Sequence, residues 1–358
     1  MTDVLIAGAG PTGLTLACDL ARRGVTVRVI DQRTSPHRES RGKSLNRDGL
    51  RVFTDLGVAG RLAALGIPDL TFRKYFDGAH VDDTSVPDFL FLGQWQIEAV
   101  LRDRLAEFGV HVEYGARLTG VRQDATGVDA ELADGRGIRA GHLAGCDGGR
   151  STTRALLGIS FEGTSEEEQT MVIGDVTAPG LGRDVWHQWF TSDGGAMMLC
   201  PIPGTETFQL QASREGDEYG RPLPPSLESF QRLFDRHARM PGIRLGEATW
   251  LSTWGVNVRM AARIREGRAF LAGDAAHVQP IAGGLGMNTG ILDAAALART
   301  LAAALDEEPG PARETALGAY EAERLPAAAE VLTETVRRHR RVLAAVRTAG
   351  NGTEVGRG

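Results

Sequence analysis

The chain has 358 residues, a formal net charge of −6 and 42% hydrophobic residues, as expected of a globular protein with a sizeable core. The acidic balance argues against nucleic acid as a partner, because such partners require a basic face. No apolar run reaches membrane-spanning length, and a strand pattern starts at residue 3 or 4, so we expect neither an anchor nor a signal peptide. The cysteines, Cys18, Cys146 and Cys200, form no CxxC motif, which favours the cytoplasm.

The N-terminal part alternates strand and helix patterns. An apolar run at residues 4–7 predicts a buried parallel strand, and a glycine turn leads from it to a helix pattern at 14–20. After Gly24 a strand is predicted at 25–30, which completes a unit of the size of a right-handed crossover. The patterns that follow are a helix at 96–108, a strand at 110–114 and strands separated by turns over 121–143.

The middle of the chain changes character, because strand patterns there are joined by Gly- and Pro-rich turns. These strands are predicted at residues 186–191, 196–200 and 207–212. A buried-strand pattern at 268–272 then returns the chain to the first domain. Alanine-rich helices are predicted at 286–305 and 314–349.

The first chemical motif is a GxGxxG sequence directly after the first strand. Gly8 permits a tight turn, Gly10 lets the backbone approach a pyrophosphate, and Gly13 lets helix and strand pack closely. Asp31 ends the second strand, where a carboxylate can accept the hydroxyls of a ribose. The alternative is a glycine-rich loop without a ligand. The position of the motif directly after the strand, together with Asp31, makes that alternative a minor one. We expect cofactor contacts from the neighbouring residues Pro11, Thr12, Gln32 and Arg33 as well.

A second motif runs from Cys146 to Arg154 between a strand and a short apolar stretch. Asp147 and Arg154 could brace a corner near the cofactor, whereas a plain β-turn with Ser151 as a helix N-cap is an equally good interpretation.

The third motif, residues 267–290, is the most specific. Gly273 and Asp274 come straight off a strand end, where a carboxylate can accept a hydroxyl of the chain that links a pyrophosphate to a flavin ring. Gly284 and Gly286 remove side chains, so that the backbone can lie against a flat ring. The helix that follows directs its positive end at that ring. Pro280, Met287 and Asn288 complete the expected contacts.

These three motifs, in this order and spacing, resemble the para-hydroxybenzoate hydroxylase family of single-component FAD-dependent aromatic monooxygenases. The likeness is greatest to bacterial aromatic-polyketide and phenol hydroxylases, without their C-terminal thioredoxin-like domain. It extends to residues 320–326, which resemble the family's helix after the flavin site. The resemblance implies that Arg41 lies on a segment crossing the cofactor and that Gln96 contacts FAD from a helix start.

The resemblance also implies the fold: an α/β protein with a Rossmann-type FAD-binding domain, an interleaved mixed-sheet substrate domain and C-terminal helices. We assign residues 1–70, 96–170 and 263–349 to the FAD-binding domain with its helices. Residues 71–95 and 171–262 form the substrate domain, and 350–358 a flexible tail.

The reaction implied by the family hydroxylates an aromatic substrate, phenolic or polyketide-like, with O2 through a C4a-hydroperoxyflavin. NADPH or NADH acts as a transient reductant, and no second dinucleotide motif or metal-ligand spacing is present. The catalytic residue is unknown, since the chemistry is centred on the flavin. His277 is a weak candidate for a base, although packing of the loop is the better interpretation.

Substrate contacts are expected from the sheet. Pro201 and Pro203 stand where benzoate hydroxylases carry a serine and an arginine, which favours a larger neutral or phenolic substrate. Gln188, Phe190, Leu199 and Pro201 are candidate pocket residues, with sheet core as the equally good alternative.

Other functions stay open at this point. A Baeyer–Villiger oxygenase or a flavin-dependent dehydrogenase could use the same fold, and a non-catalytic carrier of flavin or aromatic ligands is a further alternative. The basic run at 337–341 is expected to be a solvated helix face rather than a nucleic-acid site. We expect a monomer or homodimer.

Overall fold

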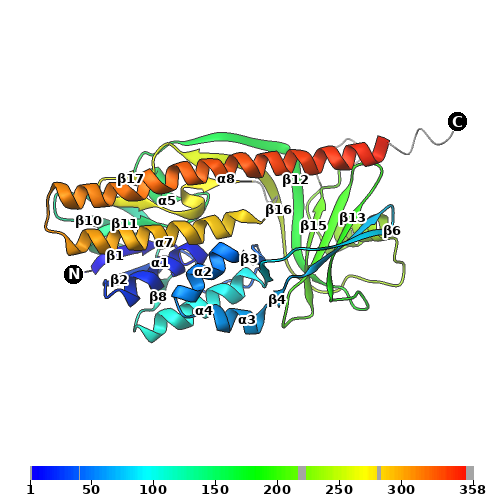
Figure 1. Cartoon of the computed structure of the whole chain (residues 1–358), viewed down its shortest axis with the longest axis horizontal. Helices are drawn as coiled ribbons and strands as arrows, with labels where there is room; N and C mark the ends of the chain where they lie inside the picture. Colours follow the sequence, from blue (N-terminus) through cyan, green and yellow to red (C-terminus); the bar gives the residue numbers. More distant parts are fainter. Residues whose placement is uncertain (1, 40, 217–222, 280–283, 352–358) are drawn as a thin grey trace.

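The computed structural model describes residues 2–39, 41–216, 223–279 and 284–351 (Figure 1). Its first sheet has the spatial order β17-β18-β11-β1-β2-β8, and β9 and β10 extend it beside β11. The strands are β1 (Thr2–Ala7), β2 (Val27–Asp31), β8 (Val112–Tyr114), β9 (Leu118–Gln123), β10 (Val128–Leu132), β11 (Gly137–Gly145), β17 (Arg265–Glu266) and β18 (Ala269–Leu271).

The centre of this sheet is parallel. β1 pairs with β2 on one side and with β11 on the other, and β11 pairs in parallel with β18. The chain therefore leaves β1 towards one side and returns on the other, which makes a topological switch point beside β1. Because the strands run the same way, their carboxyl ends share one edge.

Helices cover this sheet and supply its core. They are α1 (Pro11–Arg22), α2 (Arg47–Asp55), α3 (Ala59–Leu65), α4 (Gln94–Glu107), α5 (Thr152–Leu156), α7 (Leu285–Asp306) and α8 (Pro311–Asn351), with a 3-10 turn η1 (Gly273–Ala275). Leu14, Ile97 and Leu297, from α1, α4 and α7, belong to one buried cluster. The long helix α8 extends across both parts of the molecule (Figure 1). Its Tyr320 donates a buried hydrogen bond of 2.8 Å to the Leu271 carbonyl.

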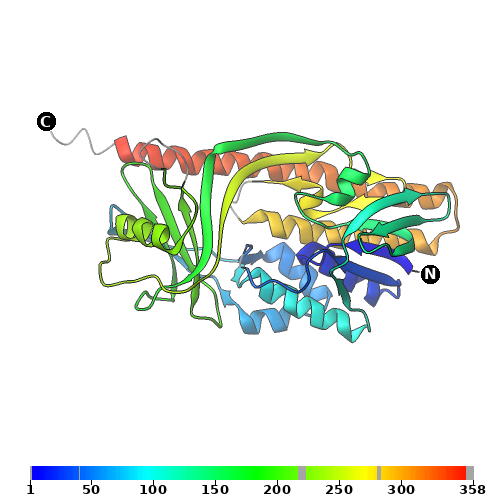
Figure 2. The same ribbon diagram turned by 180° about the vertical axis from the view of Figure 1, so that it is seen from behind.

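The second sheet has the order β19-β16-β12-β15-β14-β13-β5-β6. Its strands are β5 (Thr71–Phe76), β6 (Ala79–Ser85), β12 (Phe161–Thr177), β13 (Val185–Phe190), β14 (Ala196–Pro201), β15 (Thr207–Ser213), β16 (Ala248–Ala261) and β19 (His277–Val278). Helix α6 (Leu227–Ala238) covers its outer face, seen in Figure 2. Trp189, Phe208 and Phe234 are core residues between α6 and the sheet. A small sheet of β3 (Ser44–Asn46), β4 (Ile67–Pro68) and β7 (Phe89–Phe91) contributes Phe91 to a cluster with Cys200.

Two long antiparallel strands connect the cores. β12 and β16 pair from Phe161 opposite Ala261 to Val176 opposite Ala248. Phe161 and Ala261 pack in the core of the first sheet, whereas Val176 belongs to the core under α6. Figure 2 shows both strands arching from one part to the other. The α/β architecture is as expected, while the residue-by-residue division into two domains stays a prediction, because β12 and β16 belong to both.

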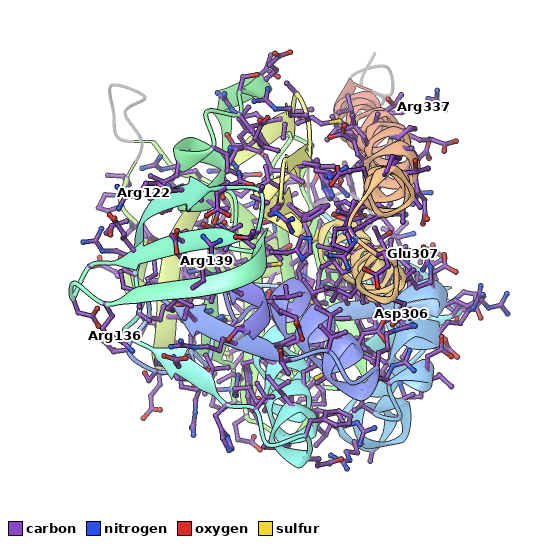
Figure 3. The ribbon with its side chains drawn as sticks, turned by 90° about the vertical axis from the view of Figure 1, so that its left-hand side faces the viewer. Arg122, Arg136, Arg139, Asp306, Glu307 and Arg337 are labelled. Atoms are coloured by element: carbon purple, nitrogen blue, oxygen red, sulfur yellow. The ribbon has the colours of Figure 1, made fainter. Side chains whose placement is uncertain are left out.

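Charged side chains line the outer surface of the β9–β11 extension (Figure 3). Arg139 forms ion pairs of 2.7 Å with Asp124 and 2.8 Å with Asp129, and Arg122 pairs with Glu131. On α8, Arg337 pairs with Glu334 at 3.2 Å. These arginines therefore have acidic partners. Among the described residues no helix is both long enough and apolar enough to cross a membrane.

Candidate FAD and substrate site

The carboxyl edge of the first sheet collects the motif residues. Ala7 is in register with Ile30 and Gly145, and Gly145 with Leu271. The residues that follow these strands are therefore neighbours, although they are far apart in the sequence. Backbone bonds hold the edge together: Gly8 N–H donates to the Ile30 carbonyl at 2.8 Å, and Cys146 N–H to the Ala7 carbonyl at 2.7 Å.

The glycines of the first turn have different structural reasons. Gly8 has φ +104°, and a Cβ on it would lie 2.3 Å from the Cys146 carbonyl oxygen. A Cβ on Gly13 would lie 1.9 Å from the Gly8 oxygen, so both positions are closed to other residues. A Cβ on Gly10 would meet nothing within 4 Å. Gly10 is also the N-cap of α1 and makes no side-chain cap, so open space lies at unpaired N–H groups, which suits a pyrophosphate.

Asp31 is fixed at the end of β2. Its Oδ2 accepts the Ala9 N–H at 2.8 Å, and Arg33 pairs with the same oxygen at 2.9 Å. Burial raises the pKa of Asp31, but the Arg33 side chain and the amides of Ala9 and Arg33 outweigh burial and hold the pKa below its ordinary value. The group is thus a carboxylate at neutral pH beside the glycine turn, whereas Gln32 is exposed.

Asp147 and Arg154 brace the corner after β11. Asp147 accepts hydrogen bonds from the Thr153 N–H at 2.9 Å and from the Ser151 hydroxyl. Arg154 donates to the carbonyls of Ala275 and Gly149, each at 2.9 Å. The pair therefore links α5 to the turn that carries Asp274. This bracing uses their polar atoms, so their direct contact with FAD remains only a proposal.

Asp274 is exposed although Gly273 and Ala275, on either side of it, are buried. Within the part of the chain that the structure describes, its carboxylate has no hydrogen-bond partner. Gly273 has φ +62°, and a Cβ on it would lie 2.5 Å from Thr12 Oγ1, so Thr12 packs against this turn. Desolvation by the surrounding protein raises the pKa of Asp274 above its ordinary value, although its surface is accessible. A carboxyl group without a protein partner after β18, at the switch-point edge, fits a hydroxyl-bearing cofactor.

His277 lies in a buried ion-pair cluster rather than at a reacting position. Its Nε2 is 2.7 Å from Asp293 Oδ2, and Arg324 Nε is 2.8 Å from Asp293 Oδ1. Asp293 also accepts the Gly273 N–H at 3.1 Å. Burial lowers the pKa of His277, but the Asp293 carboxylate outweighs burial and raises it. The Nε2 atom of His277 is engaged by Asp293, which favours the expected packing role over that of a base: His277 positions the Asp274 turn with Asp293 and Arg324.

The start of α7 meets the segment after Arg41. Gly284 has φ +63°, and a Cβ on Gly286 would meet nothing within 4 Å, so the backbone is open there. The Met287 sulfur would lie 3.1 Å from a Cβ on Gly42, so Met287 packs on that segment. The Asn288 side chain accepts the Asn46 N–H at 2.9 Å and donates to the Ser44 carbonyl at 3.1 Å. Asn288 therefore fastens β3 to α7. Pro280 lies outside the described residues.

The glutamine that faces the Arg41 segment is Gln94 rather than Gln96. Gln94 Oε1 accepts the Gly42 N–H at 3.0 Å, and the Gln94 N–H donates to the Gly42 carbonyl at 2.8 Å. Gln96 instead donates to the Pro203 carbonyl of the second part at 3.0 Å. Both stand at the start of α4, two residues apart, and the sequence alone does not decide between them. Arg41 is exposed and pairs with Glu39 at 2.7 Å.

The inner face of the second sheet, opposite α6, is buried and polar. One row of cross-strand neighbours contains Asp175, Gln209 and Cys200, and the next contains Gln211, Met198 and Gln188. Gln188 and Phe190 are on this face by strand alternation. Leu199 is not: it is fully buried in the α6 core, and Pro201 pairs with Phe208 of the same core. Gln188 and Phe190 therefore stay candidates for substrate contacts, whereas Leu199 and Pro201 lie on the side of the α6 core and are no longer candidates.

Lys43 is the main site residue that the motifs did not reveal. It follows Arg41 and Gly42, is 8% exposed, and donates to Gln209 Oε1 at 2.6 Å. Its ammonium lies 4.1 Å from the centre of the Trp186 ring. It therefore joins the cofactor-side segment to the inner face of the second sheet. A signal for it exists in the sequence, because the chain has only two lysines among its 40 basic residues.

Comparison with known proteins identifies the family. The model of the FAD binding domain family matches residues 1–335. A flavin-dependent monooxygenase of Mycobacteroides abscessus is 38% identical over 94% of this chain and 74% of its own length. A rifampicin monooxygenase of Streptomyces venezuelae is 37% identical over 94% of this chain and 70% of its own.

The structure of aklavinone-11 hydroxylase with FAD and aklavinone superposes with a TM-score of 0.80 at 29% identity, over 94% of this chain and 68% of that one. Open glycine positions, a free carboxylate at the switch point and these relatives agree with one another. The chain belongs to the FAD binding domain family and is an FAD-dependent monooxygenase of the aromatic hydroxylase class.

Proposed function

We propose that the chain uses NAD(P)H and O2 to hydroxylate a phenolic or polyketide-like aromatic compound. The observation that carries the proposal is the position of Lys43. The segment from Arg41 packs on Met287 of α7 on one side and, through Lys43 and Gln209, contacts the buried polar face of the second sheet on the other. Cofactor residues and a candidate substrate surface thus meet at one segment.

When bound, FAD supplies the redox chemistry, by accepting a hydride from NAD(P)H and activating O2. The chain supplies position and electrostatics. Gly10 and the α1 N-terminus would hold the pyrophosphate, and Asp31 the ribose. Asp274 would hold the linking chain, with Gly284, Gly286 and Met287 beside the ring. The buried inner face of the second sheet would orient the aromatic compound and keep water from it.

The inner face also bears on the size and charge of the substrate. Its described polar groups are mostly neutral amides, those of Gln188, Gln209 and Gln211, each less than a tenth exposed. Neutral amides recognise hydroxyl and carbonyl oxygens, which aromatic polyketides carry at several positions. This composition supports an oxygen-rich aromatic substrate over a simple benzoate.

The proposal is tested with the purified FAD-loaded protein and a panel of phenols, naphthols and hydroxylated anthraquinones. We expect at least one compound to accelerate NADH or NADPH oxidation and to yield a product with one added oxygen-18 atom under labelled O2. A labelled ring-expanded lactone would show Baeyer–Villiger chemistry instead. A yellow protein whose NAD(P)H oxidation no compound accelerates would contradict the proposal and favour a carrier.

A further inference from the structure

The buried ammonium of Lys43 has no anion to neutralise it at close range. In the part of the chain that the structure describes, no carboxylate oxygen lies within 4 Å of its nitrogen, in contrast to Lys74, which pairs with Asp82 at 3.3 Å. One hydrogen bond goes to Gln209, and one face of the nitrogen lies over the Trp186 ring. An ammonium has three donors, so Lys43 can still donate to a further acceptor. A buried cation that lacks a directly contacting anion is costly, and a bound anionic ligand would lower that cost.

The acidic residue on this buried face, Asp175, acts on Lys43 only through its longer-range charge, and the groups in direct contact with the ammonium are neutral. Gln209 Oε1 accepts from both Lys43 and, at 2.9 Å, Gln211, so this oxygen is fully used. The indole N–H of Trp186 is buried and has no partner among the described residues. Lys43 and Trp186 thus each keep a donor that no described residue uses.

The choice of lysine is informative in so arginine-rich a chain. Arginine would keep its charge at all relevant pH values, whereas a buried lysine can lose its proton near neutrality. Burial lowers the pKa of Lys43 to about 8, although Cys200 and Asp175 act in the opposite direction. Burial raises the pKa of the Cys200 thiol to about 11, so that group stays protonated. Lys43 is thus the group in this cluster that can exchange a proton at physiological pH.

We propose that Lys43 accepts the proton of a phenolic hydroxyl of the substrate and holds the resulting phenolate. The O–H bond breaks, its electron pair stays on oxygen, and the proton forms an N–H bond on the neutral amine of Lys43. The product is an ammonium–phenolate pair in a buried site, and the transfer needs no oxidant or reductant. An ionised ring is richer in electrons, which favours its attack on an electrophilic oxygen. This inference rests on the proposed hydroxylation, whose substrate class it narrows to ionisable phenols.

A phenolate fits the cluster better than a carboxylate does. A carboxylate has two oxygens and is best bound by a guanidinium fork, but the cluster offers a single ammonium. The pKa of Lys43, about 8, is closer to that of an ordinary phenol, about 10, than to that of a carboxyl group, about 4, which would be ionised before it bound.

The first test measures Lys43 directly. The protein is labelled with carbon-13 at its lysine side chains, and its two lysines should give two signals. The variant Lys74→Met assigns these signals and also serves as the control at the surface lysine. We expect the Lys43 signal to titrate near pH 8. Binding of a phenol should keep Lys43 charged to higher pH, because the phenolate favours its ammonium form. A Lys43 signal that titrates only at about pH 10 or above, or is unmoved by every phenol, would overturn the proposal.

The second test reads the ligand in the oxidised protein, without turnover. The probes are 4-nitrophenol and alizarin, whose colours change when the phenol ionises. We expect the wild-type and Lys74→Met proteins to lower the pKa of the bound probe by about 1 to 3, as a charge at close range does. Lys43→Met, which substitutes an apolar side chain of similar length, should abolish this effect. Binding of neither probe at millimolar concentration, or an equal effect in Lys43→Met, would overturn the assignment.

A further variant separates substrate chemistry from a structural role. Gln209→Glu keeps Lys43 but gives it a permanent anion, so the Lys43 pKa should rise and the probe should no longer ionise. In turnover, Lys43→Met should lower kcat/KM for phenols by about 10- to 100-fold. The loss should be smallest for phenols that are already ionised at the assay pH. If no compound is oxygenated at all, the proposed function fails, while the signal of Lys43 and the probe spectra still decide this inference.

Discussion

Single residues at the carboxyl edge of the first sheet divide into those that shape it and those that face a ligand. Asp147, Arg154 and His277 all have protein partners at hydrogen-bond distance. Asp274, which lies among them, has none in the described part of the chain and is exposed. The same motif sequence therefore contains both framework and binding groups, and only their partners tell them apart.

Asp274→Ala is expected to weaken FAD binding by about 10- to 100-fold, because a hydrogen bond to a charged group is worth about 1.5–3 kcal/mol. Stability of the apoprotein should hardly change, since no described residue loses a partner. Asp147→Ala should lower the stability of the apoprotein and change FAD affinity less, because Ser151 and Thr153 lose their hydrogen bonds to Asp147. Flavin fluorescence titration and thermal melts of the two apoproteins measure both quantities. A larger loss of FAD affinity in Asp147→Ala would contradict this division of roles.

At the scale of elements, hydrophobic periodicity predicts which strands and helices exist better than it predicts which face of a strand is covered. The predicted strands and helices correspond to β1, β2, β8, β13, β14, β15, β18, α1, α4, α7 and α8, with ends shifted by a few residues. Strand β14 shows why facing is harder. Its residues are apolar on both sides, and Leu199 and Cys200 are both fully buried, so no polar alternation tells which face each of them occupies. Only the packing of α6 settles it.

Contacts between elements set a similar limit at the site. The ion pairs of Asp293 with His277 and Arg324 join α7, β19 and α8, which are separate in the sequence. The partner of the buried Lys43 ammonium is Gln209 of β15, which is far along the chain. Part of the glycine motif could be predicted because local constraints demand glycine: Gly8 has φ +104°, and a Cβ on Gly13 would collide with the Gly8 carbonyl. Long-range partners carry no such local signal.

The central strand β11 predicts a dependence of stability on pH. His142 is 1% exposed, both ring nitrogens lack partners among the described residues, and burial lowers its pKa to about 4. Between its unfolded value near 6.5 and about 4, the unfolded chain binds the proton more readily. Protonation of His142 therefore does not affect the free energy of unfolding above pH 6.5, but it lowers that free energy by about 3 kcal/mol as the pH drops to 4.

His142→Phe should remove this loss, so that its free energy of unfolding exceeds that of the wild type increasingly as the pH falls from 7 to 4. Denaturant titrations at several pH values measure the difference. His111→Phe, at an exposed position, is the matched control and should follow the wild type. A constant difference between His142→Phe and wild type over this range would show that His142 does not titrate on unfolding.

At the scale of the whole molecule, β12 and β16 link the two hydrophobic cores, because both strands run through both of them. Each strand contributes side chains to both cores, and α8 runs along both parts (Figure 1). Neither core can lose its strands without disturbing the other. We therefore expect cooperative unfolding despite the two separate sheets.

Tryptophan and flavin report on the two parts separately. Four of the five tryptophans lie on β13 and β16, while released flavin reports on the first part. Both signals should change at the same midpoint, and added FAD should raise both midpoints together. Thermal melts followed at the two wavelengths provide the measurement. Two separate midpoints would show that the sheets unfold independently.

The paired strands β12 and β16 also matter for protein engineering. Since Phe161 and Ala261 lie side by side, the chain leaves the nucleotide-binding part and re-enters it at neighbouring points. A surface with different ligand preference could be transplanted from a relative through these two junctions. The graft must include β5 and β6, because β5 pairs in parallel with β13 and would otherwise face a foreign strand. Recombination at a single crossover point would therefore split the transplanted sheet, whereas exchange of both segments, 71–85 and 161–261, would move β5 and β6 together with the strands from β12 to β16.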